Sequence, residues 1–173
     1  GSGCTLPGCP CPDQVCADRA DLDAYIVAEC FGGGVFTTAC CDTLQNLNVA
    51  AVLDFSGVFA TETFGACTPL NLTNWSAEPF AVNTSFASMF AANINVAGLE
   101  NWKTENVVSM SRMFSSNDVF NGNIGGWDVS KVTSFQSLFM DARSFNQNLS
   151  NWNVAKVTTM MGMMDTLKKI ALI

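Results

Sequence analysis

The stretch that decides the fold is 127–165, which reads WDVSKVTSFQSLFMDARSFNQNLSN (127–151) and then WNVAKVTTMMGMMD (152–165). The two segments align without a gap, so the pattern that begins at Trp127 begins again at Trp152. The preceding segment, WKTENVVSMSRMFSSNDVFNGNIGG (102–126), has the same length and pattern. Self-similarity at a period of about 20–50 residues is typical of solenoid proteins. Tryptophans mark the unit starts, and the last three are evenly spaced: Trp75, Trp102, Trp127 and Trp152.

Apolar residues recur at fixed positions within these units. A less regular first unit begins at Leu47, which takes the tryptophan position, and the unit that begins at Trp75 contains an insertion. One unit is too short to bury its own apolar residues, so stacked units must form a shared core. The columns are Val52, Val107, Val132 and Val157 five residues after the unit start, and Phe55, Met110, Phe135 and Met160 eight residues after it.

The expected fold class is α/β, a short leucine-rich-repeat-like solenoid of about five coils with a helical, disulfide-rich N-terminal cap. The β-branched segment 131–134 predicts a short strand. The spacing of Phe135, Leu138, Phe139 and Ala142 predicts a short helix after it. Residues 18–30 predict an amphipathic capping helix. We therefore expect a Cys-rich segment and capping helix over 1–46, repeats over 47–165, and a C-terminal tail or cap over 166–173.

Eight cysteines lie between Cys4 and Cys67, an even number that predicts disulfides in an oxidising compartment. The sequence does not choose among the 105 pairings that eight cysteines allow. A structural zinc site formed by the first four is the less favoured alternative, because their spacing differs from that of zinc knuckles. A redox-active pair is a further alternative. The disulfide candidates are Cys4, Cys9, Cys11, Cys16, Cys30, Cys40, Cys41 and Cys67.

Four N-x-[ST] motifs agree with passage through a secretory pathway, and they predict N-glycosylation if the source is a eukaryote. The candidate acceptors are Asn71, Asn74, Asn83 and Asn148.

Composition excludes several classes of protein. The net charge is −7, so a nucleic-acid partner held by phosphate contacts is not expected. The negative charge is concentrated in residues 1–78, which contain nine acids and one base. The sequence contains no run of about 18 apolar residues, so it predicts no membrane span. The sequence contains no histidine, the usual general base and metal ligand. We expect no catalytic residues, no metal and no cofactor.

The pattern W-[DN]-V-[SA]-K-V-T-x-[MF]-x-x-[LM]-[FM], followed by F-N-Q-N-L-S-x-W, resembles the BspA-like leucine-rich-repeat surface proteins. The resemblance covers about residues 47–165, and the segment RADLDAYIVAEC (19–30) resembles the one that precedes the first repeat in that family. It implies a secreted or surface-displayed solenoid used for adhesion, recognition or assembly, with no catalytic residues. A lumenal location is also compatible with the cysteines.

Two functions follow, and both are non-enzymatic. The first is adhesion or recognition of a protein or glycan through the repeat surface, represented by Val108, Thr133 and Thr158. The second is a structural subunit that packs end to end through its solenoid ends, with self-association. An ice- or mineral-binding surface and an enzyme using Asp128 and Asp141 are weaker alternatives. The expected assembly edge consists of Met160, Met163, Met164, Ile170 and Leu172.

Overall fold

The computed structural model describes residues 18–26, 44, 46–60, 69–76, 78–92 and 94–165. These residues form a mixed α/β structure in which short strands pair in parallel, β1 with β3 and β2 with β4. This confirms the predicted α/β class in its coarse form. The elements in chain order are α1 (Arg19–Tyr25), β1 (Leu70–Asn71), η3 (Thr73–Ser76), β2 (Thr84–Ser85), β3 (Val96–Ala97) and β4 (Val107–Ser109).

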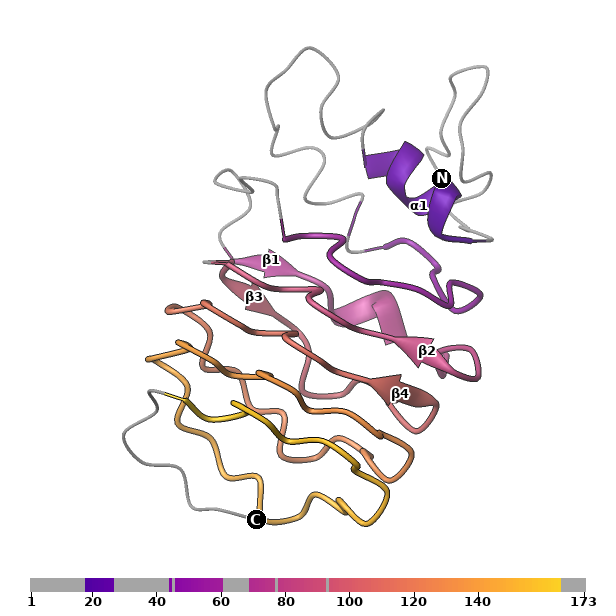
Figure 1. Ribbon diagram of the computed structural model, residues 1–173. Coiled ribbons are helices and arrows are strands. Elements are labelled where there is room, and N and C mark those ends of the chain that lie inside the picture. The colour runs from indigo at the N-terminus through magenta and orange to yellow at the C-terminus, as the bar shows by residue number, and fades with distance from the viewer. Residues whose placement is uncertain are drawn as a thin grey trace, which may run out of the picture.

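Equivalent segments of successive repeat units lie side by side and run in parallel, from α1 at one end to residues 152–165 at the other (Figure 1). We call the segments 47–60, 80–92, 102–117, 127–142 and 152–165 layers. One residue from each layer takes part in a continuous line of parallel bridges. These residues are Asp54, Ser85, Ser109, Ser134 and Thr159.

Backbone hydrogen bonds between layers continue beyond the bridges. The amides of Phe135, Ser137 and Phe139 each donate to a carbonyl of layer 152–165, at N···O distances of 2.9 Å. The amides of Met110, Arg112 and Phe114 bond in the same way to layer 127–142, at 2.8–3.1 Å. Alternate amides therefore point at the next layer, as in a parallel sheet. This register explains the sequence period, since one repeat unit supplies one layer.

The predicted helix at Phe135–Ala142 is wrong, because the structure has a series of turns there. Leu138 and Ala142 each donate their amide to the carbonyl three residues earlier, at 3.1 Å, so each turn closes over four residues. The third residues of these turns, Ser137 and Asp141, have positive φ angles of 53° and 59°. A left-handed residue ends helical geometry. Four-residue turns return side chains inward at nearly the same spacing as a helix does, which is why the sequence pattern misled.

The predicted strand at 131–134 is reduced to a single bridge at Ser134, because the turns begin directly afterwards. The equivalent segment one unit earlier is the three-residue strand β4.

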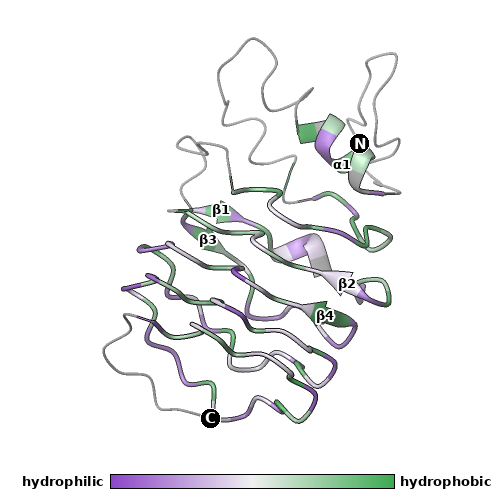
Figure 2. Cartoon of the chain, in the orientation of Figure 1, coloured by the Kyte–Doolittle hydropathy of each residue, from purple (hydrophilic) through white to green (hydrophobic). Residues whose placement is uncertain are grey.

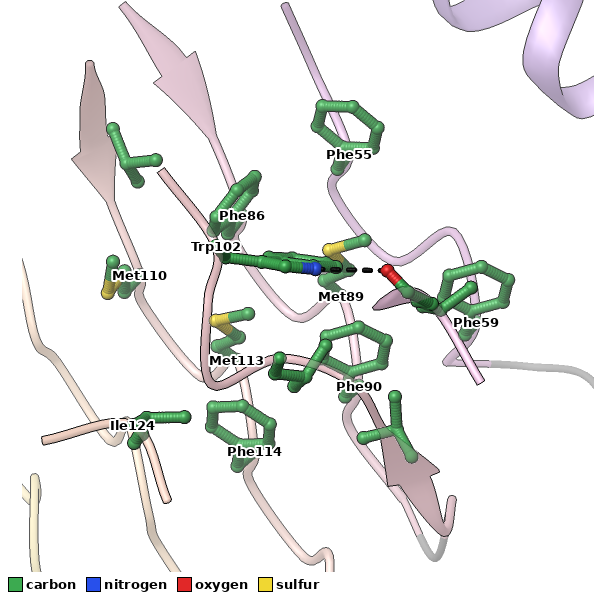
Figure 3. Packing of buried hydrophobic residues seen from close by; sticks show 14 of the residues in the cluster. Phe55, Phe59, Phe86, Met89, Phe90, Trp102, Met110, Met113, Phe114 and Ile124 are labelled. Atoms are coloured by element: carbon green, nitrogen blue, oxygen red, sulfur yellow. Dashed lines mark hydrogen bonds between the residues drawn. The ribbon is translucent and has the colours of Figure 1, made fainter. Parts of the chain in front are cut away.

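Aromatic rings form the centre of the core. Phe59, Phe90, Phe114 and Phe139 occupy equivalent positions and stack in sequence, with ring centroids 5.6–5.7 Å apart. All four side chains are buried. Figure 3 shows Phe59, Phe90 and Phe114 of this stack with the methionines of the neighbouring columns. In Figure 2, hydrophobic and hydrophilic segments alternate along each layer, as expected when every unit contributes to both core and surface.

Each tryptophan side chain donates a hydrogen bond to a backbone carbonyl that precedes its own unit. The buried indole Nε1 of Trp102 donates to the carbonyl of Leu72 at 3.1 Å (Figure 3). The same carbonyl accepts the backbone amide of Trp75, so one oxygen joins two units. The other indole bonds run from Trp75 to Leu44, from Trp127 to Leu99 and from Trp152 to Ile124.

Helix α1 packs over the first layer. Leu22 and Ile26 are buried in the same core cluster as Leu44 and Leu47. The predicted helix is confirmed over 19–25, whereas its predicted continuation to residue 30 lies outside the described residues. All eight cysteines, and therefore the disulfide and zinc predictions, also lie outside the described residues. The predicted domain boundaries stay predictions.

Candidate functional site

The structure brings the three predicted surface residues together in one column. The amide of Thr133 donates to the carbonyl of Val108 at 2.9 Å, and the amide of Thr158 donates to the carbonyl of Thr133 at 2.8 Å. Both threonines are exposed, and Val108 is half-buried. The threonine hydroxyls donate to the same carbonyls, at 3.1 and 3.0 Å. These hydroxyls are therefore fixed in position and present their oxygens as acceptors.

Four half-buried hydroxyl residues, Ser85, Ser109, Ser134 and Thr159, form a column next to the threonines. They are the members of the line of parallel bridges that follow Asp54, which is exposed. Ser134 lies within 2.6 Å of Ser111, measured between the two hydroxyl oxygens, and Ser85 lies 3.3 Å from Ser56. Over layers 102–117, 127–142 and 152–165, the Thr133 and Ser134 columns contain no charged side chain. The surface they form is uncharged and rich in hydroxyl groups.

Charged side chains lie at turns beside this surface. The Asp128 carboxylate accepts the amide of Ser130 at 2.9 Å. Hydrogen bonds from the side chain and backbone of Ser130 lower the pKa of Asp128, and Lys131 contributes in the same direction. A carboxyl group with a lowered pKa is ionised at neutral pH and is a poor general acid. Asp128 therefore has the environment of a turn-stabilising residue.

The glycosylation candidates lie at separate places on the surface, and all four are exposed. Asn74 donates its side-chain amide to Asn46 at 2.9 Å, so these two asparagines pair across adjacent units. Asn71 accepts both the amide and the hydroxyl of Thr73, at 3.0 and 2.6 Å. Asn148 accepts the amide of Ser150, and Asn83 has a φ angle of 66°. Glycosylation stays a prediction.

A pocket of about 170 Å³ lies beside Leu47 and Trp75, the first residues of the first two units. Its apolar floor includes Leu47 and Trp75, and its rim carries asparagine amides and the Glu78 carboxylate. The sequence reasoning did not identify it as a site. The only sequence signal for this pocket is that an asparagine precedes each of the two unit starts, Leu47 and Trp75. The lining residues are Asn46, Leu47, Asn48, Ala50, Asn74, Trp75 and Glu78.

The predicted assembly edge is described in part. In layer 152–165, Met160 is 40% exposed and Met164 is half-buried, whereas Met163 is buried. Val154 and Val157 are also half-buried, although their counterparts one unit earlier are fully enclosed. Ile170 and Leu172 lie outside the described residues. Within the part of the chain that is described, this layer is the one whose core residues remain partly open.

Among the described residues, no group of three or more acidic, cysteine or histidine side chains is arranged to hold a metal ion. No described helix is long and apolar enough to cross a membrane.

A family model matches residues 81–171, more than half of the chain. The family is DUF285, described as "Mycoplasma protein of unknown function". It is in general a BspA-like repeat family, which confirms the coarse part of the resemblance. No curated protein and no solved structure matches the chain. With its match over stacked repeat layers, the chain belongs to the DUF285 family.

Proposed function

We propose that this chain is a non-enzymatic recognition module of the cell surface or extracellular space, which binds a protein or glycan through its repeat surface. Its architecture in this proposal is a leucine-rich-repeat-like solenoid of about five coils. The column of Val108, Thr133 and Thr158 carries the proposal, because it is an ordered and uncharged surface that crosses three layers.

The chemistry of this column suits a neutral partner. Its hydroxyl hydrogens are engaged by backbone carbonyls, so the surface offers mainly acceptor oxygens and methyl groups. Sugar hydroxyls and peptide amides can donate to such acceptors. Because the backbone holds both threonines in register, little side-chain entropy is lost when a partner binds.

Several features support an extracellular, non-enzymatic role. The sequence lacks histidine, has eight cysteines between Cys4 and Cys67, and contains four exposed N-x-[ST] asparagines. Membership in a BspA-like repeat family agrees with a surface or recognition module.

The experiment is a binding screen of the full chain against immobilised glycans and intact cells, with Thr158→Glu as the test variant. A negative side chain on the column should abolish binding of a neutral ligand. The matched control is Asn146→Glu, which adds the same charge at an exposed position away from the column. Equal loss of binding in both variants, or unchanged binding by Thr158→Glu, would contradict the assignment of this surface.

A second candidate function is a structural subunit that assembles through the end of its stack. The partly open layer 152–165 favours it, since Met160 is 40% exposed while Phe135, one unit earlier, is 0% exposed. Light scattering over a concentration series tests it, with Met160→Lys as the variant. Oligomers that this substitution disrupts support assembly, whereas a monomer at every concentration argues against self-association.

A further inference from the structure

We infer that the pocket beside Leu47 and Trp75 is a second binding site, which takes the acetamido group of a neutral N-acetylhexosamine residue of a glycan. This site goes beyond the proposed function, because it lies between the first two units, whereas the Thr133 column crosses the layers from 102 to 165. The size of the pocket, its apolar floor and its polar rim define the ligand.

The pocket occurs where leucine replaces tryptophan at a unit start. In two later units, the indoles of Trp102 and Trp127 stack with ring centroids 6.2 Å apart. Leu47 holds the equivalent position next to Trp75, and its smaller side chain leaves a space of about 170 Å³. Cavities of roughly 150 Å³ accept a molecule the size of benzene. An acetamido group and the adjoining edge of a sugar ring therefore fit.

The floor of the pocket is apolar. It consists of Leu47 and Trp75, which are buried, and of Ala50, which is half-buried. A methyl group gains free energy by leaving water for such a floor, whereas a charged group would lose its hydration there. The part of the ligand that enters first should therefore be apolar.

The rim offers a donor and an acceptor at exposed residues. Asn48 accepts the amide of Ala50 through its Oδ1 at 3.1 Å, which orients the side chain and leaves its Nδ2 to donate. Among the described residues, neither this Nδ2 nor the Glu78 carboxylate has a hydrogen-bond partner. An acetamido group complements all three features: its methyl suits the floor, its carbonyl accepts from Asn48, and its N–H donates to Glu78.

The remaining rim residues and the local charge favour a neutral sugar. Asn74 donates its Nδ2 to Asn46 at 2.9 Å, so its own Oδ1 is left as an acceptor for a ring hydroxyl. Glu78 is the charged residue of the lining, and residues 1–78 contain nine acids and one base. This negative charge disfavours acidic sugars. An N-acetylhexosamine combines the methyl, the amide and the hydroxyls without a charge.

The test is saturation-transfer difference NMR of N-acetylglucosamine with the full chain. The chain is produced in a host that adds no N-glycans, because Asn74 lines the pocket and is also a glycosylation candidate. We expect a dissociation constant of about 1 mM, with the largest saturation at the acetyl methyl protons. Glucose lacks the acetamido group and N-acetylneuraminic acid adds a carboxylate, so both should bind at least about 10-fold more weakly.

A filled pocket should not bind the sugar. Ala50→Phe places a ring in the space and should abolish binding. Ala155→Phe is the matched control, because Ala155 has the same position in the last unit and its amide donates to Asn153 as that of Ala50 donates to Asn48. Binding should persist in the control.

A second variant tests the rim without filling the pocket. Glu78→Ala removes a charge-assisted hydrogen bond to the ligand and should weaken binding roughly 10-fold or more. It removes no contact between described residues, so the fold should be unchanged. Glu100→Ala, which removes an exposed acid outside the pocket, is its control and should bind as the native chain does.

The inference is overturned if no saturation transfer is seen up to about 10 mM sugar, or if glucose binds as well as N-acetylglucosamine. Equal losses in Ala50→Phe and Ala155→Phe, or unchanged binding by Glu78→Ala, would also overturn it. Tighter binding of glucosamine would identify an ammonium group as the ligand and refute the acetamido assignment. Thr158→Glu should leave this binding unchanged, so the pocket and the Thr133 column can fail separately. Loss of binding in Thr158→Glu would place the sugar on that column instead.

Discussion

Layers 127–142 and 152–165 have nearly the same sequence in their first halves, WDVSKVT and WNVAKVT, yet they differ in burial. Val129 and Val132 are buried, whereas Val154 and Val157 are half-buried. Phe135 is 0% exposed and its counterpart Met160 is 40% exposed. The first of these layers has described neighbours on both sides, and the second has one on a single side (Figure 1).

The difference shows that burial in this fold comes from the neighbouring unit and not from the unit itself. In such a stack the free energy of unfolding is approximately a sum of terms for each unit and for each interface between units. Residues that face forward, meaning toward the following unit, should therefore contribute differently to the free energy of unfolding in the two layers. Residues that face backward, meaning toward the preceding unit, should contribute about equally in both layers.

The largest expected effect concerns the forward-facing core column. Phe135→Ala should lower the free energy of unfolding by roughly 3–5 kcal/mol, because it removes a fully buried ring. Met160→Ala should cost less than about 2 kcal/mol, below the range for buried methionine, because its side chain is partly in water already. Urea unfolding of both variants measures this, and equal losses would refute the comparison.

The next effect concerns a backward-facing residue. Trp127 and Trp152 are both 3% exposed, and each indole bonds to the preceding unit. Replacing either with phenylalanine leaves a buried carbonyl with one donor fewer and should cost about 1–3 kcal/mol. The two costs should be similar in urea unfolding. A much smaller loss of stability for Trp152→Phe would show that layer 152–165 also packs weakly against the preceding layer.

A smaller effect concerns the turns. Gly57 and Arg112 occupy the same position in their units and have φ angles of 66° and 56°. Gly57→Ala should lower stability by about 1–2 kcal/mol, since alanine is strained there although its Cβ would meet no close neighbour. Arg112→Gly should raise stability by up to about 1 kcal/mol. Thermal unfolding measures both variants. A more stable Gly57→Ala variant or a less stable Arg112→Gly variant would show that backbone conformation does not set these positions.

The smallest effect is the pH dependence that Asp128 contributes. Its pKa is lowered in the folded protein, so its stabilisation is present above the unfolded pKa of about 3.9 and is lost as pH falls through the lower folded value. Asp128→Asn should keep the turn, because Asn153 accepts the amide of Ala155 at the equivalent position. The variant should therefore show weaker acid destabilisation than the native chain in unfolding between about pH 2 and 5. Identical acid profiles would show that the carboxylate contributes nothing.

Much of the architecture could be predicted from the sequence, because the spacing of apolar residues directly reflects which side chains face the core. The even spacing of Trp102, Trp127 and Trp152 defined the unit length, and the columns at Val132 and Phe135 are buried as expected. The stacking of Val108, Thr133 and Thr158 also follows from the repeat register alone.

The turns could not be predicted from the same spacing. Phe135, Leu138, Phe139 and Ala142 fit a helix and a pair of four-residue turns equally well. The decisive signal was weak, namely that glycine occupies one position in two units, at Gly57 and Gly162, both with positive φ. The indole bonds and the pocket beside Asn46 depend on contacts between units, for which the sequence carries no direct sign.

The most direct test of the central claim is hydrogen exchange of individual amides in the native chain, measured by NMR. If each layer is stabilised by its neighbours, the amides of Phe135, Ser137 and Phe139 should exchange slowly, because each bonds to the next layer. The equivalent amides of Met160, Gly162 and Met164 should exchange much faster. Equal protection in the two layers would contradict the account.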